Sequence, residues 1–246
     1  MKVISSMATR HLLAELAEAA VVRGLPALEV ESVGGVDAAR RVRDGEEFDV
    51  VVLADDAVAA LASEGHVDAA TLTPIATSQV AVARASASGE PAVDPGVVAF
   101  ADAAELREAL LAAKRIGYST GPSGAALVAM IASWGLVNEL GPRLVQASPG
   151  VPVARLVADG EVDLGFQQLS ELVGQQGVQI LGVMPADCAV TTVFGGAVAA
   201  TAADAAGARA VLEFLGSPGV APLIERHSFE ATMVPRASRS VATATD

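Results

Sequence analysis

The chain has 246 residues, of which 52% are hydrophobic and 18% charged, and its formal net charge at pH 7 is −13. This composition excludes a disordered chain, and the acidic charge disfavours nucleic acid and anionic lipid surfaces as partners. The single cysteine, Cys188, excludes an intramolecular disulfide and a thiolate metal cluster. No apolar run approaches the roughly 18 residues of a membrane span, so we expect no membrane insertion.

Short apolar segments alternate with longer helical patterns, which predicts an α/β fold of βαβ units with a mostly parallel sheet. In chain order the first half is predicted to hold strands over 2–5, 28–32 and 49–54, alternating with helices over 9–23, 36–43 and 57–64. A strand over 78–83 and a Ser-, Gly- and Pro-rich stretch over 86–96 follow. The second half is predicted to hold strands over 115–118, 162–166, 179–183 and 190–200, with helices over 106–114, 123–134, 151–159, 203–215 and 220–226.

The strand over 78–83 and the long apolar run over 190–200 are suited to cross between two lobes, the first into lobe 2 and the second back to lobe 1. Residues 1–80 and 194–246 are expected to form lobe 1, and residues 81–193 lobe 2. A pair of strands bends more easily than a packed core, so the lobes are expected to hinge around whatever lies between them. The tail over 238–246 is expected to be loose.

The amino terminus shows no export segment, because Met1 to Ser5 run directly into a polar turn without a cleavage site of small residues. We therefore expect a cytoplasmic protein as the chain stands, and a periplasmic or extracellular one if a leader has been removed.

Two turns in the first half follow predicted strands, where ligands bind in open α/β sheets. Ser5 and Ser6 begin a turn whose hydroxyl residues are expected to cap the next helix and leave its first N–H groups free for an anion. Gly34 and Gly35 allow the backbone to approach a ligand closely. The alternatives are an ordinary helix cap and a tight turn without a ligand.

A third turn follows the strand that ends at Tyr118, and it contains Ser119, Ser123 and Gly124 around a proline. Its hydroxyl groups and glycines form a donor-rich loop. The loop lacks the lysine and the spacing of a phosphate-binding P-loop, so nucleotide hydrolysis is not expected. Although a plain capped turn would look the same, all three turns are expected to open toward one site.

The order of these turns, the segment VADGEVDLGFQQ over 157–168 and the segment LEFLGSP over 212–218 resemble the molybdate-binding-protein-like branch of the periplasmic solute-binding proteins. The resemblance runs from Met1 to Pro235. It implies a two-lobed type II periplasmic-binding-protein fold, a small anionic ligand between the lobes, no cofactor or metal, and an ABC-transporter permease as partner. It also implies ligand contacts from Ser6, Gly34, Gly35, Ser123, Gly124, the turn at Val151, and Gln168.

The sequence departs from the molybdate-binding pattern at two of these positions. Gly34 and Gly35 stand where the molybdate binders have a serine, and the tyrosine that those proteins carry near Gln168 is missing. Arg10 follows the first turn, and an arginine there favours a planar carboxylate, which a guanidinium can bind with two hydrogen bonds. The alternative for Arg10 is a solvated helix residue.

Some proteins similar to this branch are enzymes, such as aconitate isomerase, which shifts a double bond in a tricarboxylate without a cofactor. That chemistry needs a base that removes a proton beside a carboxylate, an acid that returns one, and donors that hold the developing negative charge. The candidates are three histidines and three glutamates, which we interpret as structural, exposed or capping residues: His11, His66, His227, Glu29, Glu31 and Glu171. The sequence therefore predicts a solute-binding protein first, a cofactor-independent isomerase second, and a ligand-sensing domain third.

Overall fold

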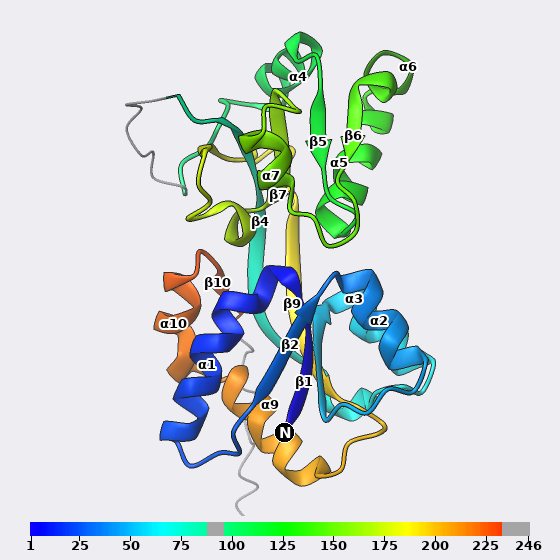
Figure 1. The fold of residues 1–246 in the computed structure, drawn as a ribbon, viewed down its shortest axis with the longest axis vertical. Helices are drawn as coiled ribbons and strands as arrows, with labels where there is room; N and C mark the ends of the chain where they lie inside the picture. Colours follow the sequence, from blue (N-terminus) through cyan, green and yellow to red (C-terminus); the bar gives the residue numbers. More distant parts are fainter. Residues whose placement is uncertain (88–95, 233–246) are drawn as a thin grey trace, which may run out of the picture.

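The computed structural model describes residues 1–87 and 96–232, and in it two lobes lie one above the other, joined by two long strands (Figure 1). The predicted loose tail over 238–246 and most of the stretch over 86–96 lie outside the described residues. Within 1–87 and 96–232, none of the helices combines the length and hydrophobicity that a bilayer span requires.

The sheet of lobe 1 is parallel in its first three strands and antiparallel where the crossing strands join it. Its strand order is β2 (Glu29–Val33), β1 (Lys2–Ser6), β3 (Val50–Ala54), β9 (Thr191–Val198) and β4 (Thr73–Ala85), with β10 (Glu230–Ala231) paired to β4. Since β3 is a continuous apolar run, it can be buried on both faces. Val50 and Val52 pack on one face of the sheet, and Val51 and Leu53 on the other.

Helices cover both faces of this sheet (Figure 1). One face carries α1 (Arg10–Val22), α9 (Ala205–Leu215) and α10 (Ala221–Arg226), and the other carries α2 (Gly35–Arg43) and α3 (Asp55–Ser63). Short 3-10 turns complete the lobe: η1 (Met7–Thr9), η2 (Ala69–Thr71) and η4 (Pro218–Val220).

Lobe 2 repeats the arrangement around the second half of β4. Its strands are β8 (Val178–Val183), β7 (Leu164–Gln168), β5 (Ile116–Tyr118) and β6 (Leu144–Gln146), and β4 pairs with both β8 and β7. Its helices are α4 (Ala103–Ala112), α5 (Pro122–Ser133), α6 (Val137–Leu140), α7 (Val153–Ala158) and α8 (Leu169–Leu172), with η3 (Gly141–Arg143). Small residues let α7 approach the sheet closely, since a Cβ on Gly165 would lie 2.4 Å from Val157.

The register of β4 determines which strand ends lie at the boundary between the lobes. Up to Gln79, β4 pairs with β9 in lobe 1, and from Val80 onward it pairs with β7, whose last residue is Gln168. Because β5 and β6 run parallel to β7, and β8 is antiparallel to β4 as β7 is, these four strands of lobe 2 end toward lobe 1. The strands β1, β2 and β3 run antiparallel to β9 and end toward lobe 2. The carboxyl ends of three strands of lobe 1 and four strands of lobe 2 therefore face one another across the boundary.

The predicted two-lobed α/β fold is confirmed by this architecture, with a few local differences. β4 begins at Thr73 rather than at residue 78, because its first half lies in lobe 1 beside β9. Four short elements were not predicted, since none is long enough to show a hydrophobic period: α6, α8, β6 and β10.

Candidate functional site

The turn after β1 holds a buried hydroxyl group without a partner. The Ser5 hydroxyl lies 2.7 Å from that of Ser32, and Thr9 donates to the Ser6 carbonyl at 3.1 Å. The Ser6 hydroxyl is buried and has no hydrogen-bond partner. The prediction that these hydroxyl groups cap the next helix is wrong: neither Ser6 nor Thr9 makes a side-chain cap, because η1 lies between β1 and α1.

The Gly34–Gly35 turn lies beside Ser6. Gly34 is the N-cap of α2, which begins at Gly35, and neither glycine has a positive φ. A Cβ on Gly35 would lie 3.8 Å from that of Ser6, and a Cβ on Gly34 would meet nothing within 4 Å. Glycine is therefore not required by the backbone here, and these two positions leave space that side chains would fill.

In lobe 2, the turn between β5 and α5 is held by its own serines. The hydroxyl groups of Ser119 and Ser123 lie 2.9 Å apart, and Gly121 donates its N–H to Ser119 Oγ at 3.3 Å. Gly124 is required by the close approach of the chain, because a Cβ there would lie 1.9 Å from the Ser119 carbonyl oxygen. The exposed Val151 precedes α7, and its amide already donates to the Ser148 carbonyl at 2.9 Å.

Gln168, the last residue of β7, provides a second polar atom without a partner. Its Nε2 donates to Thr192 on the crossing strand β9 at 2.7 Å, and its Oε1 is buried without a partner. If the carboxamide turns over by 180°, Thr192 donates to Oε1 and the Nε2 donor becomes free. Gln168 can therefore offer a ligand either an acceptor or a donor.

Glu171 on α8 is a partly buried carboxyl whose environment the sequence did not reveal. Burial raises the pKa of Glu171 to about 7, although a hydrogen bond from Gln167 and the charge of Arg10 act in the opposite direction. Gln167 Nε2 donates to Glu171 Oε2 at 2.7 Å, and Gln167 Oε1 accepts from the Val153 N–H at 2.9 Å. The interpretation of Glu171 as a surface or capping residue is therefore wrong.

The two lobes touch at η1 and α8, which connects the two sets of residues. Ser170 donates its hydroxyl to the Ala8 carbonyl at 3.1 Å. Arg10 is exposed at the start of α1, 3.0 Å from the His11 ring, and its charge acts on Glu171 in the other lobe. The structure thus brings the Ser6 and Gly35 turn, Arg10 and the end of β7 to one boundary.

Most of the other acid–base candidates are engaged elsewhere. His227 contacts Glu15 at 2.6 Å, and Glu31 is paired with Arg41. Among the described residues, no group of three or more His, Cys, Asp or Glu side chains could hold a metal ion.

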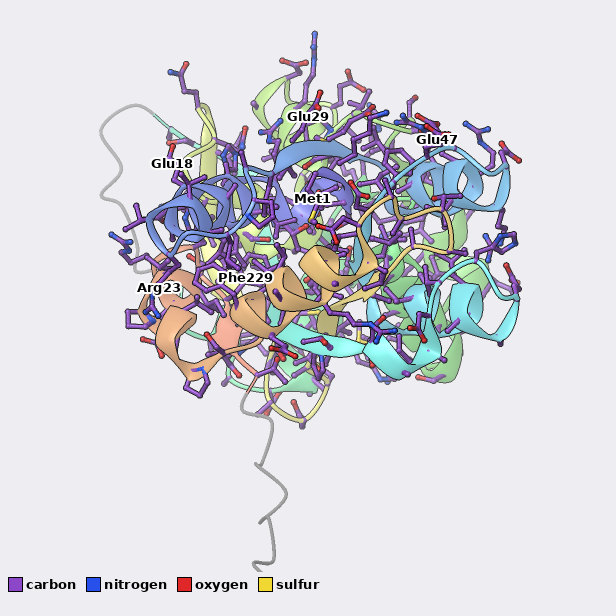
Figure 2. The ribbon with its side chains drawn as sticks, turned by 90° about the horizontal axis from the view of Figure 1, so that it is seen from below. Met1, Glu18, Arg23, Glu29, Glu47 and Phe229 are labelled. Carbon is purple, nitrogen blue, oxygen red and sulfur yellow. The ribbon has the colours of Figure 1, made fainter. Side chains whose placement is uncertain are left out.

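A surface pocket of about 420 Å³ lies at the opposite end of lobe 1, lined by Lys2, Glu29, Glu31, Glu46 and Glu47 among others. Figure 2 shows Met1, Glu29 and Glu47 together on the face turned away from lobe 2. Four glutamates repel an anion, so this pocket is not a candidate for the predicted ligand.

Comparison with known proteins agrees with this fold. The family model described as "Bacterial extracellular solute-binding protein" matches residues 1–230. The chain belongs to this family. A curated relative, aconitate isomerase from Pseudomonas sp., is 31% identical over 185 residues, which is 75% of this chain and 68% of the relative.

Two solved structures of solute-binding proteins show the same fold. The periplasmic molybdate-binding protein of Azotobacter vinelandii matches with a TM-score of 0.73 and 19% identity, over 96% of this chain and 100% of the other. The sulfate-binding protein of Mycobacterium tuberculosis matches with a TM-score of 0.67 and 19% identity, over 93% and 85%.

For this solute-binding family member, sequence reasoning missed three residues at the lobe boundary, Gln167, Ser170 and Thr192, and named Glu171 without its buried setting. The sequence QQLSE over 167–171, directly after the predicted strand over 162–166, places a carboxamide and a carboxylate near one strand end, which is a signal that could have drawn attention to this pair. Nothing local marks Thr192 or Ser170, because their partners are distant in the chain.

Proposed function

We propose that the chain binds a small anion that carries carboxylate groups, held between the two lobes. One observation carries the proposal: two buried polar groups without partners, the Ser6 hydroxyl and the free end of the Gln168 carboxamide, come from facing strand ends of opposite lobes. An anion accepts hydrogen bonds but cannot donate them, so it pairs with Gln168 when the carboxamide is turned over and Nε2 is the free atom. A buried polar group without a partner costs about 1–3 kcal/mol, and a ligand that pairs with both groups would remove this cost.

Relatives of the chain support an anionic ligand. The two solved structures are named for molybdate and sulfate, and the curated relative for aconitate, which is a tricarboxylate. A permease of the ABC type is the expected partner of a binding protein in this family.

Two features favour a carboxylate over a tetrahedral oxyanion. Arg10 lies at the boundary, and a guanidinium binds a carboxylate in a planar, two-bond geometry. Gly34 and Gly35 leave open space beside Ser6, which accommodates a ligand larger than molybdate.

Thermal unfolding with a panel of anions tests the proposal, because a ligand that binds only the folded state raises the melting temperature. The panel is cis-aconitate, trans-aconitate, citrate, molybdate, tungstate and sulfate. We expect a carboxylate to give the largest increase. No increase with any member would contradict the proposal, and a larger increase with molybdate would contradict the preference for carboxylates.

A negative charge introduced at the start of α5 tests whether the ligand binds at the lobe boundary, because it would repel an anion there. Ser123 is buried at the start of α5, so Ser123→Asp puts a carboxylate at the lobe boundary and is expected to abolish binding, with circular dichroism to check that the variant is folded. Ser133→Asp adds the same charge at the other end of the same helix and is expected to bind normally. Equal affinity in the two variants would exclude this location.

A second candidate function is a cofactor-independent isomerase, favoured by Glu171 and by the aconitate isomerase relative. In such a reaction the Glu171 carboxylate takes a proton from the CH₂ beside a substrate carboxylate, the double bond moves, and the same proton returns to the carbon at its far end. Incubation with cis- or trans-aconitate, with the isomer ratio followed by NMR, tests this. A constant ratio in the presence of tight binding excludes the isomerase.

A further inference from the structure

Glu171 lies beside the proposed ligand site on an element that contacts both lobes. Its helix α8 follows β7 directly, and β7 ends with Gln168 at the boundary. The preceding residue, Ser170, donates to Ala8 in the other lobe. Arg10 in lobe 1 is close enough for its charge to act on the carboxyl.

The two oxygens of this carboxyl differ in their surroundings. Gln167 Oε1 accepts from the Val153 N–H, which fixes the carboxamide so that its Nε2 donates to Glu171 Oε2. Among the described residues, Glu171 Oε1 has no hydrogen-bond partner, and it is not among the fully buried atoms. One oxygen is therefore held by the protein, and the other can face a ligand.

Few charges act on Glu171 from the elements packed around it. β7 and β8 contain no charged residue, and η1 contains none either, although Arg10 and His11 follow it. On β4 the charged residue is Arg84, which pairs in register with Gln179 beyond the boundary. Burial dominates, so at neutral pH the protonated and ionised forms of Glu171 are both populated.

A bound anion changes this balance, because a second negative charge within about 4–6 Å disfavours the ionised carboxyl. We propose, on the basis of the anion-binding function and in place of the isomerase, in which Glu171 would have to be ionised, that Glu171 carries a proton whenever an anion occupies the site and donates a hydrogen bond to it through Oε1. Above neutral pH, binding then takes up one proton from solution. Glu171 acts as a donor that is available only in the acid form, so the affinity depends on pH.

Isothermal titration calorimetry at pH 8 in two buffers of different ionisation enthalpy measures this proton uptake. The probes are trans-aconitate and sulfate, whose acidic groups are fully ionised at pH 8, so any proton taken up belongs to the protein. We expect close to one proton per bound probe. The affinity should fall close to tenfold per pH unit between pH 7.5 and 8.5.

The variant Glu171→Gln keeps a hydrogen-bond donor but cannot ionise. It is expected to bind with no proton uptake and with an affinity that does not change over this pH range. Glu161→Gln, a change of the same kind at an exposed residue of lobe 2, is expected to behave like the unmodified chain.

The possible results separate the role of Glu171 from the anion-binding function. Binding without proton uptake by the unmodified chain overturns the role of Glu171 and leaves the anion-binding function standing. Uptake that persists in Glu171→Gln assigns the proton to another group and also overturns it. A lack of heat with both probes, together with no thermal shift across the panel, overturns both proposals.

Discussion

At the scale of single residues, the site is marked by polar atoms that the fold leaves without partners. Most buried polar groups in native proteins are hydrogen-bonded, and Ser5 illustrates this through its contact with Ser32. Ser6, the next residue, has a buried hydroxyl with no partner. Two adjacent serines on one strand thus have different environments, which makes them a matched pair for mutation.

Ser6→Ala is expected to weaken binding of the best anion in the panel by about tenfold to a hundredfold, since a hydrogen bond to a charged group contributes about 1.5–3 kcal/mol. Its free energy of unfolding without ligand should be unchanged or higher by up to about 1 kcal/mol, because a buried group without a partner is removed. Ser5→Ala should instead lower the free energy of unfolding by about 1 kcal/mol. Calorimetry and urea unfolding of both variants check this, and equal losses of affinity would contradict it.

Glu171 makes a prediction about stability that needs no ligand. Its pKa is about 7 in the folded chain against 4.5 for an ordinary glutamate, so the folded state holds the proton more tightly. The contribution of Glu171 to the free energy of unfolding is therefore greatest below pH 4.5, falls as the pH rises to about 7, and is constant above that.

Glu171→Gln removes this pH dependence. Because the side chain is partly exposed, we expect the variant to gain about 1–3 kcal/mol relative to the unmodified chain between pH 5 and pH 8. Urea unfolding of both proteins at the two pH values measures the gain. A constant difference would show that the ionised carboxyl is well solvated in the folded state.

At the scale of elements, sequence patterns predicted the long strands and helices because each has a clear period or a continuous apolar run. β3 and α1 were predicted within about two residues of their bounds, a margin typical of end fraying. The four-residue α8 could not be predicted, since one turn shows no period, and with it the setting of Glu171 was missed.

The sequence also located the candidate turns without revealing how their groups are used. It placed Ser6 and Gln168 among the contacts, the first from its position after a strand and both from family resemblance. It could not reveal that the Ser5 hydroxyl is paired with Ser32, or that the Val151 amide bonds to Ser148, because these depend on tertiary packing.

The turn between β2 and α2 offers a test at this scale, because its two glycines differ in what a side chain would face. Gly35→Ala places a methyl group 3.8 Å from Ser6 and is expected to reduce the affinity for a carboxylate by about tenfold or more through lost space. The methyl group of Gly34→Ala would meet nothing within 4 Å, so the affinity of this variant should be closer to that of the unmodified chain.

Gly35→Ala should not harm the fold, since its backbone has a negative φ and alanine favours a helix over glycine by up to about 1 kcal/mol. Gly34 is the N-cap of α2, where alanine is less favourable than glycine, so Gly34→Ala is expected to lower the free energy of unfolding by about 1 kcal/mol at most. Calorimetry with circular dichroism melting checks both statements. A loss of affinity in Gly34→Ala as large as that in Gly35→Ala would contradict the proposal that the ligand occupies the space between Gly35 and Ser6.

At the scale of the whole molecule, two strands connect lobes that also touch through a few side chains. β4 and β9 carry the chain between the lobes, and Gln168 is anchored to β9 through Thr192. Away from these strands, the bond from Ser170 to the Ala8 carbonyl joins the lobes directly. Since closure of two lobes on a ligand depends on the relative free energy of open and closed arrangements, a single contact of this kind can shift the balance.

Ser170→Ala removes that contact and is expected to favour the open arrangement. Loss of one neutral hydrogen bond of about 0.5–1 kcal/mol should lower the affinity for the best anion by two- to fivefold. The melting temperature should hardly change, because neither core is altered.

Ser133→Ala is the control, since Ser133 donates to the Met130 carbonyl within one helix and its removal should leave the affinity unchanged. Calorimetry gives the affinities, and small-angle scattering should show a larger radius of gyration for Ser170→Ala only without ligand. If the two variants bind and scatter alike, the contact between η1 and α8 does not control closure. The relative free energy of the open and closed arrangements would then depend on the connecting strands β4 and β9 alone.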